Sequence, residues 1–399
     1  MTPVWTLFTL WVGLALIASL LSVRLRVSTA LTEICVGTAA QLILGTAFGA
    51  TVLGSDEGWI KFLAGIGAIM LTFLAGAELD PIVFKKKWKE ATTLGLAGFF
   101  FPFLGCAAAA HYVLGWDVMA SWLGGVALST TSVAVVYAVM IEYGLNKTEY
   151  GKTVLAACFI NDLGTVLALG VVFARYDLRL LIFGAVTVAV LVVLTRYAPW
   201  MFKRLGQRVS EPQTKFVSLV LLGLGGMASV AGSEAVLPAY LVGMALAPTF
   251  LADRELPRRM RIIAFSILTP FYFLKAGSLV EFRAVIASIG LIVVLLAIKM
   301  ATKFIGILPL TRYHQFDRRE GMYTTLLMST GLTFGSISAL FGLTNKIIDQ
   351  TQYTILVTAV IGSAVVPTLI AQTWFQPAFK LLTDEAGLPD AESAAREEP

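Results

Sequence analysis

Long apolar stretches follow one another along almost the whole chain, with only short polar segments between them. They run over residues 4–22, 31–53, 58–78, 92–114, 118–141, 153–174, 178–196, 216–232, 235–250, 262–279, 284–310, 321–342 and 352–376. About 20 apolar residues allow a helix to cross a bilayer, where the backbone has to satisfy its own hydrogen bonds. We therefore predict an all-α polytopic membrane protein with about 13 transmembrane helices in a lipid bilayer.

Composition leaves little room for anything else. Of the 399 residues, 57% are apolar and only 14% are charged, whereas about 25% are charged in soluble domains. A sizeable soluble catalytic or nucleotide-binding domain is excluded, and no phosphate-binding loop, zinc motif or Ser/His/Asp set is found. We expect no enzyme, no cofactor and no nucleic-acid partner. The transmembrane domain is predicted over residues 1–378, followed by a short, disordered cytoplasmic tail over residues 379–399.

The basic residues predict the orientation of the chain. Alternate loops hold 22 of the 30 Lys and Arg residues, and the intervening loops hold 5. Because cytoplasmic loops are enriched in Lys and Arg, the N-terminus is predicted outside and the C-terminus in the cytoplasm. The expected location is the cell (inner) membrane.

Two pairs of similar segments share one offset along the chain. "ALSTTSVAV" (127–135) resembles "LMSTGLTFGS" (327–336), and "FLAGAEL" (73–79) resembles "FLKAGSL" (273–279). A shift of seven spans reverses the orientation, so we predict an inverted repeat of spans 1 to 6 and 8 to 13, with span 7 as linker. The Ser/Thr-rich segments are either helix-packing surfaces or interruptions of two helices whose backbone and hydroxyls replace the water shell of a cation. We favour the interruptions.

Asp162 is the ionisable residue that stands out within the spans. It lies near the middle of span 6, in "VLAACFINDLGTVLALG", with no charge between Lys152 and Arg175. A charge at this depth is costly, so it is a functional candidate. Either a proton or a metal cation can neutralise the carboxylate, one at a time, and Asn161 offers a carbonyl oxygen beside it. The alternative is a structural hydrogen bond or ion pair.

Other charged residues are candidates for supporting roles. Lys299 and Lys303 are four residues apart in span 11 and share one helix face. They either pair with a carboxylate in the empty site or extend to the membrane surface. The same two alternatives apply to Lys275 in "TPFYFLKAGSLV". Glu78 in "AGAELDP" is placed to support the interrupted helices.

Taken together, these segments resemble a known family. "FLAGAELDP", "ALSTTSVAVVYAVMIEYGLNKTEYGKTVLAACFINDLGTVLAL", "TPFYFLKAGSLV" and "KFIGILPL" are similar to the monovalent cation/proton antiporter-2 family, the Kef-type and Nap-type exchangers, over residues 10–375. The resemblance implies two crossed discontinuous helices. It also implies a core domain, around spans 3–6 and 10–13, that moves in an elevator-like way, and a dimerisation domain from the remaining spans, so we expect a homodimer.

The resemblance also implies roles for individual residues. Asp162 matches the aspartate that binds the ion and carries the proton, and Asn161 matches its partner position. Thr130 and Thr131 match the hydroxyls of the broken helix, so Na⁺ or K⁺ is expected at Asp162 with these two threonines. Lys303 matches the core lysine, and its separation from the interruption in span 12 favours it over Lys299.

The chain departs from the family pattern in three places. Asn161 stands where electrogenic sodium exchangers usually carry a second aspartate, which favours electroneutral exchange. Lys303 favours electrogenic exchange instead, so the stoichiometry of the exchange stays open. Lys275 replaces a residue that is usually small or apolar, and the nucleotide-binding domain of Kef-type proteins has no counterpart in the tail.

The predicted function is secondary active antiport of Na⁺ or K⁺ against H⁺ through competition at Asp162. The alternative is a sodium-coupled symporter of an organic solute on a related fold, which requires a roomier polar cavity. A channel fits less well, because channels usually present rings of ligands in an oligomer.

Overall fold

Helices form nearly all of the computed structural model. It describes residues 4–377 apart from 26–27, 49–51, 78–85, 143–144, 146–147, 174–177, 206–209, 232–234, 253–254 and 376. The segments are helical because every backbone group has to be satisfied internally within lipid, and most of their residues are apolar because the core of the bilayer is hydrocarbon. The predicted tail after residue 378 lies outside the described residues.

The chain divides into two series of helices joined by a long one. The first series is α1 (Val4–Leu25), α2 (Thr29–Phe48), α3 (Gly58–Ala77), α5 (Trp88–Tyr112), α6 (Val118–Ser129), α7 (Val133–Glu142) and α8 (Glu149–Val172). The joining helix is α9 (Leu178–Leu205). The second series is α10 (Pro212–Val230), α11 (Val236–Ala252), α12 (Glu255–Ile263), the π-helical turn η2 (Ala264–Leu268), α13 (Thr269–Ser278), α14 (Phe282–Ala287), α15 (Ile289–Tyr313), α16 (Arg318–Met328), α17 (Thr333–Thr344) and α18 (Gln350–Trp374).

Every predicted span corresponds to a helical segment, so the all-α membrane architecture is confirmed. Within the described residues, eleven segments are long and apolar enough to cross a membrane. The other two are α11, which has 17 residues, and the interrupted pair α6 and α7. The sequence did not predict the π-helical turn between α12 and α13, since the hydropathy pattern continues across it.

The helix boundaries repeat along the chain. When the residue numbers are shifted by one nearly constant amount, the bounds of α15 match those of α5, the bounds of α16 match those of α6 and the bounds of α18 match those of α8. No boundary then differs by more than about a turn of helix. The caps repeat as well. Asp117 and Asp317 accept backbone N–H groups at the starts of α6 and α16, and Thr148 and Asp349 do so at the starts of α8 and α18. A side-chain oxygen at this position satisfies an otherwise unpaired N–H group.

Close helix contacts repeat in the same way. Four of the glycines that lie directly against backbone carbonyl groups of a neighbouring helix form a repeated set, two from each half, and at each a methyl group would collide with the carbonyl oxygen. The contacts between α2 and α13 are Gly37 with Leu274 and Gly277 with Ile34; those between α3 and α11 are Gly243 with Phe73 and Gly76 with Tyr240. In the second set, α11 corresponds to α2 and α3 corresponds to α13. Along each pair of corresponding helices, the contacting residues are separated by a constant number of positions. The two halves therefore share their packing as well as their order.

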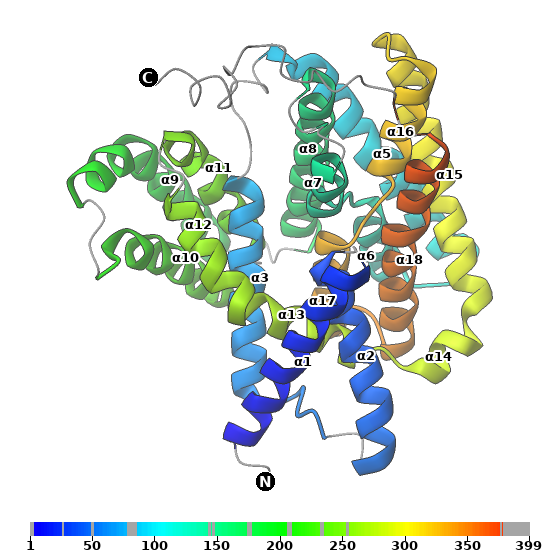
Figure 1. The fold of residues 1–399 in the computed structure, drawn as a ribbon, viewed down its shortest axis with the longest axis horizontal. Coiled ribbons are helices and arrows are strands. Elements are labelled where there is room, and N and C mark those ends of the chain that lie inside the picture. The colour runs from blue at the N-terminus through cyan, green and yellow to red at the C-terminus, as the bar shows by residue number, and fades with distance from the viewer. Residues whose placement is uncertain are drawn as a thin grey trace, which may run out of the picture.

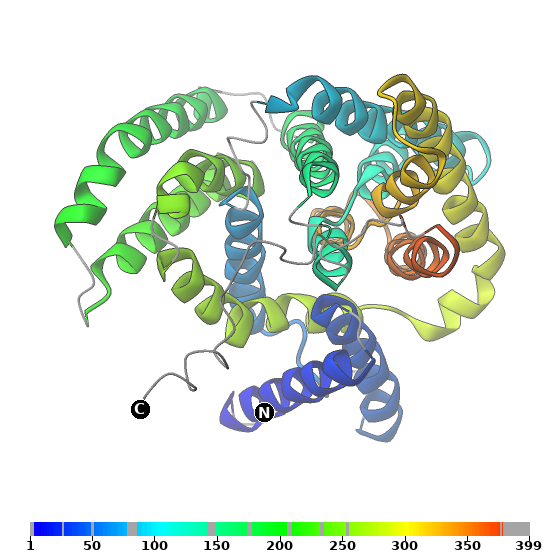
Figure 2. The same ribbon diagram turned by 45° about the horizontal axis from the view of Figure 1, so that its top comes forward.

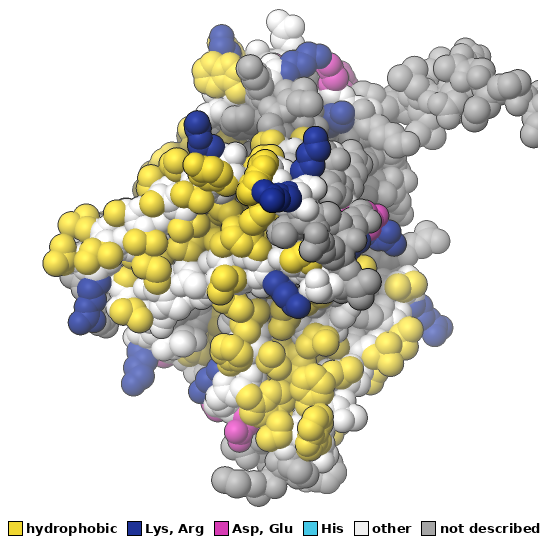
Figure 3. Space-filling view, turned by 90° about the vertical axis from the view of Figure 1, so that its left-hand side faces the viewer, with side chains coloured by type: hydrophobic (Ala, Val, Ile, Leu, Met, Phe, Trp, Pro, Cys, Tyr) yellow, Lys and Arg dark blue, Asp and Glu magenta, His cyan; other side chains and the backbone are white. Residues whose placement is uncertain are grey.

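The helices gather in two groups. Figures 1 and 2 show α5 to α8 together with α15 to α18 in one bundle, whereas α9, α10 and α11 lie on the other side of α3. Helices α9 and α10 form a largely hydrophobic side of the molecule (Figure 3), with exposed residues such as Leu181 and Leu219. Such a surface is compatible with contact to lipid tails.

Candidate functional site

Two helices are interrupted inside the bundle, at the positions that the Ser/Thr-rich segments predicted. Helix α6 ends at Ser129 and α7 begins at Val133, while α16 ends at Met328 and α17 begins at Thr333. The residues between them, 130–132 and 329–332, are fully buried or nearly so. Thr130 has extended backbone, with φ −62° and ψ 152°. The helix hydrogen-bond ladder therefore stops within the protein, where free backbone groups are tolerated if they line a site or meet protein partners.

The two interruptions lie against each other. Thr131 Oγ1 donates a hydrogen bond to the carbonyl oxygen of Met328 over 2.8 Å. Gly331 packs so closely on Thr130 that a Cβ on Gly331 would come within 3.0 Å of the Thr130 carbonyl oxygen. The interruptions lie in opposite halves of the sequence and are adjacent in space, which gives the two crossed discontinuous helices that we predicted.

Lys303 of α15 joins this crossing. Its side chain is fully buried, and Nζ donates a hydrogen bond to Thr131 Oγ1 over 3.0 Å. Because Thr131 in turn donates to Met328, the lysine is connected to both interrupted helices. Thr130 Oγ1 instead donates to the Ala127 carbonyl oxygen of its own helix, over 3.1 Å. Of the two predicted threonines, Thr131 is thus the one that links helices.

Asn161 and Asp162 lie in the middle of α8 and are almost completely buried, at 0% and 1% exposure. Within the described part of the chain, both amide atoms of Asn161 and the Oδ1 atom of Asp162 have no hydrogen-bond partner. Buried polar atoms normally have partners, so each exception requires an explanation. A site that binds an ion, a proton or water through these atoms is one such explanation.

The surroundings of Asp162 include one lysine and one tyrosine. Lys303 is near enough to act electrostatically on the carboxylate, yet none of the ion pairs formed by the described residues joins the two. Tyr240 of α11 also neighbours Asp162, and its hydroxyl donates to the Phe159 carbonyl oxygen over 3.1 Å. Asp162 therefore lies near a lysine without being held in a salt bridge by it.

Lys299 forms a separate polar cluster one turn away from Lys303. Its Nζ donates to Ser363 Oγ of α18 over 2.9 Å. Ser363 Oγ is 3.1 Å from the carbonyl oxygen of Gly331 and 2.8 Å from that of Val360, and so donates to one of them. The two lysines share a helix face, as predicted, but contact different partners.

The remaining predicted residues lie elsewhere. Lys275 is buried in α13, at 7% exposure, and Asp56 and Lys61 are charged groups that act on it. Within the described residues its amino group has no ion pair. Glu78 lies outside the described residues.

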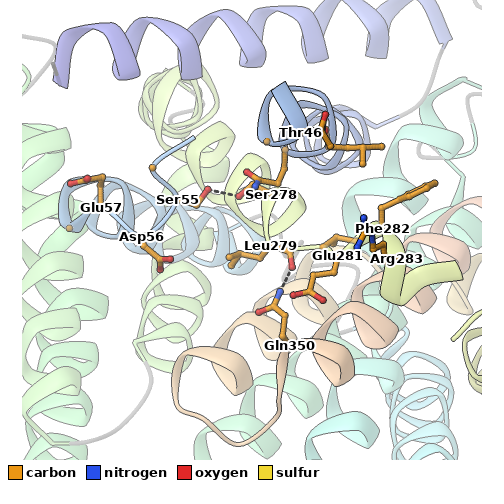
Figure 4. Close-up of a pocket in the computed structure, with 16 residues that line it drawn as sticks. Thr46, Ser55, Asp56, Glu57, Ser278, Leu279, Glu281, Phe282, Arg283 and Gln350 are labelled. Atoms are coloured by element: carbon orange, nitrogen blue, oxygen red, sulfur yellow. Dashed lines mark hydrogen bonds between the residues drawn. The ribbon is translucent and has the colours of Figure 1, made fainter. Parts of the chain in front are cut away.

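A cavity of about 680 Å³ opens at the face of the molecule where α1 begins. It is bounded by α2, α3, α13, α14 and α18, and Figure 4 shows Asp56, Glu57, Glu281 and Arg283 around it. Ser55 and Ser278 are hydrogen-bonded over 2.7 Å at its wall. Its described lining includes no residue of the crossing. It therefore does not provide a roomy polar site beside Asp162.

Comparison with known proteins assigns the chain to a family. The model of the family described as "Sodium/hydrogen exchanger, transmembrane" matches residues 12–377. The chain belongs to this family. The Kef-type and Nap-type subgroup expected from the sequence is narrower than this match and stays a prediction.

Individual members of the exchanger family are similar over most of their length. "Probable Na(+)/H(+) antiporter 3" of Methanocaldococcus jannaschii is 28% identical over 83% of this chain and 87% of that protein. "Na(+)/H(+)-K(+) antiporter GerN" of Bacillus cereus is 24% identical over 84% and 89%. The solved structure of the sodium proton antiporter MjNhaP1 from Methanocaldococcus jannaschii at pH 8 has a TM-score of 0.69. It covers 92% of this chain and 94% of its own at 14% identity, so it shows the fold.

Sequence reasoning missed several groups at the crossing of this exchanger. They are Ser363 and the backbone carbonyls of Met328 and Gly331. A single serine in an apolar helix gives no signal by itself, and carbonyl groups are present in every residue. The repeat held the missing signal, because Ser363 occupies in α18 the position that Asp162 occupies in α8.

Proposed function

We propose that this protein exchanges a monovalent cation, Na⁺ or K⁺, for H⁺ at Asp162. The observation that carries the proposal is a carboxylate that is 1% exposed, in the middle of a membrane helix, with an unpartnered oxygen beside an unpartnered Asn161 amide among the described residues. The names of the Methanocaldococcus and Bacillus relatives, both antiporters, support the same reaction class.

The coupling follows from the chemistry of one carboxylate. Asp162 Oδ1 either takes a proton or contacts a cation, and the two exclude each other. The Asn161 carbonyl oxygen adds a neutral ligand, and carbonyl groups and hydroxyls at the crossing replace further waters of the ion. A bare carboxylate at this depth is costly. The site therefore moves between the two sides of the membrane only when Asp162 carries a proton or a bound cation.

Lys303 is proposed to balance the charge of Asp162 when neither ion is bound. It acts on the carboxylate without a salt bridge and is held by Thr131. An arriving cation therefore has no strong ion pair to break, and a nearby positive charge favours its release. This arrangement suits a site that has to both bind and release its ion.

Movement and assembly belong to the same proposal. We propose that the bundle of α5 to α8 with α15 to α18 moves in an elevator-like way against the other helices, which form the dimer contact of a homodimer. The core expected from the sequence included spans 3 and 10, which contain α3 and α13. We instead propose that these two helices belong to the second body, because their glycine contacts are with α11 and α2. The proposed orientation, with the N-terminus outside, rests on the distribution of basic residues, and the proposed subgroup is the monovalent cation/proton antiporter-2 family.

Proteoliposomes containing a pH-sensitive dye test the function. Imposed Na⁺ or K⁺ gradients should drive proton movement in the wild type and in Asp56→Asn, a control that removes an exposed carboxylate. Asp162→Asn should abolish it. Cation-driven proton movement that survives Asp162→Asn would contradict the mechanism. Repeating the assay with a clamped membrane potential measures the stoichiometry.

A further inference from the structure

The inverted repeat gives Asp162 a structural counterpart in the second half. Helices α8 and α18 correspond in the repeat, and Asp162 and Ser363 are each the fourteenth residue of their helix. Ser363 contacts the crossing directly through the Gly331 carbonyl group, and each of the two residues has a lysine of α15 as a neighbour. The fold therefore contains two related polar centres.

The two centres differ in whether their polar atoms are satisfied. At the first centre, Asp162 Oδ1 and the Asn161 amide have no partners among the described residues. At the second, Ser363 accepts from Lys299 over 2.9 Å and has carbonyl oxygens of Gly331 and Val360 within 3.1 Å. Among the described residues, no amino group is hydrogen-bonded to Asp162 at the first centre, whereas the amino group of Lys299 is hydrogen-bonded to Ser363 at the second.

The amino group of Lys299 also contacts the interruption itself. A Cβ at Gly331 would collide with Lys299 Nζ and with Thr130 Oγ1. The residue that corresponds to Lys299 in the first half is Gly98, where a Cβ would lie 3.2 Å from Asn161 Nδ2. The second half thus has a lysine at this position of the helix. The first half has a glycine there, and Asn161 packs closely against it.

We propose that the Lys299 amino group occupies, in the second half, the place that the transported cation takes in the first, and that it fixes the α16–α17 interruption through Ser363. Lys299 is then a positioning residue. It is covalently attached and does not exchange, so the protein has one exchangeable cation site rather than two. This inference rests on the proposed function of Asp162.

The physical basis is the need to neutralise free carbonyl groups at an interrupted helix. An ammonium group has three N–H donors and no acceptor, so it serves the same oxygens that would otherwise coordinate a metal cation. Lys299 Nζ donates to Ser363 Oγ, which lies 3.1 Å from the carbonyl oxygen of Gly331, so the amino group reaches the interruption through this serine. A tethered cation at the second centre also keeps a mobile cation out of it.

Three variants test the positioning role in the proteoliposome assay. Lys299→Met removes the donor and should raise the cation KM about tenfold and shift the pH profile of exchange. Lys299→Arg keeps a charged donor and should stay within about threefold of the wild type. Ser363→Ala removes only the hydroxyl link and should raise KM about threefold.

The outcomes separate this inference from the proposed function. A folded Lys299→Met protein with the wild-type KM and pH profile contradicts the inference. A Lys299→Met protein that loses proton coupling as Asp162→Asn does also contradicts it, because Lys299 would then act in the exchange step. If Lys299→Met does not fold, an unchanged KM in Ser363→Ala refutes the link. The proposed function is judged from Asp162→Asn alone.

A second experiment moves the site across the repeat. In an Asp162→Asn background, Ser363→Asp alone should show no stabilisation by Na⁺, since Lys299 pairs with the new carboxylate. Adding Lys299→Ala should restore Na⁺-dependent thermal stabilisation relative to choline. A folded triple variant that Na⁺ does not stabilise contradicts the equivalence of the two centres.

Discussion

The two halves of this exchanger have the same scaffold and different chemistry at its centre. Helices α5 and α15 match in length, α8 and α18 nearly do, and the glycine contacts of α2 with α13 recur between α3 and α11. At corresponding positions, however, the first half has a carboxylate whose Oδ1 meets no partner among the described residues, and the second has a serine bound by a lysine. Repeating a fold therefore does not require repeating the polar side chains at its centre.

The difference shows how little sequence change separates the proposed ion site from its counterpart in the other half. The breaks in both halves are buried, and each touches the other. What distinguishes the two centres is the pair of side chains at Asp162 and Ser363, together with Lys299 in place of Gly98. The interruptions of both halves contribute carbonyl groups, and in our proposal the side chains decide whether a centre binds a mobile ion.

The largest predicted effect contrasts the two corresponding residues directly. Asp162→Asn should lower cation-driven proton movement at least about 100-fold, because the amide can neither ionise nor carry a proton. Ser363→Ala should lower it less than about fivefold. The pH-dye assay measures both. Equal losses would mean that the halves are not functionally distinct.

The repeated glycine contacts should be equally sensitive to a methyl group. Gly37→Ala and Gly243→Ala each place a Cβ against a backbone carbonyl that cannot move aside easily. We expect each to destabilise the protein by about 1–3 kcal/mol, measured by thermal unfolding in detergent. Gly184→Ala, where a Cβ meets no atom within 4 Å, is the control. A tolerated change in only one half would refute equivalent packing.

The two threonines of the first interruption should behave differently. Thr131→Ala removes the partner of Lys303 and the donor to Met328. Leaving these groups unpaired costs about 1–3 kcal/mol, so the cation KM should rise about tenfold. Thr130→Ala removes only a bond within its own helix and should change KM less than about threefold. A larger effect from Thr130 would indicate that its hydroxyl is the one that binds the ion.

The smallest effect concerns the caps of the interrupted helices. Asp117→Ala and Asp317→Ala should each reduce stability by about 1 kcal/mol. The loss should be slightly greater at Asp117, whose carboxylate accepts two backbone N–H groups over 2.9 and 3.1 Å. The Asp317 carboxylate accepts one over 3.4 Å, and the bond from the residue 317 backbone N–H to Glu320 remains after Asp317→Ala. Asparagine at either position should retain most of the stability. Thermal unfolding measures these differences, and a larger loss at Asp317 would contradict the ranking.

Much of the fold was predictable, because membrane helices are encoded by local composition. The thirteen segments followed from hydropathy, and the two interruptions from short Ser/Thr-rich segments at one offset. The central position of Asp162 followed from the absence of other charges nearby. These features depend on a few neighbouring residues, which a single sequence contains.

The partners of the lysines were not predictable in the same way. Lys299 and Lys303 are one turn apart, and the sequence places them on one face. Which of them contacts Thr131 and which contacts Ser363 depends on how α15 meets α6 and α18. Such contacts join residues 64 and 172 positions apart, and local pattern carries no information about them.

The hydrogen bond from Thr131 to Met328 has a consequence for biosynthesis. The two residues are 197 positions apart, and chains grow at roughly 5–20 residues per second. The interrupted α6–α7 segment therefore waits about 10–40 s after its synthesis before its partner exists. During that interval its polar groups and Asp162 need other partners, such as water, lipid headgroups or the insertion machinery. The first half of this exchanger is consequently the half most exposed to quality control at the membrane.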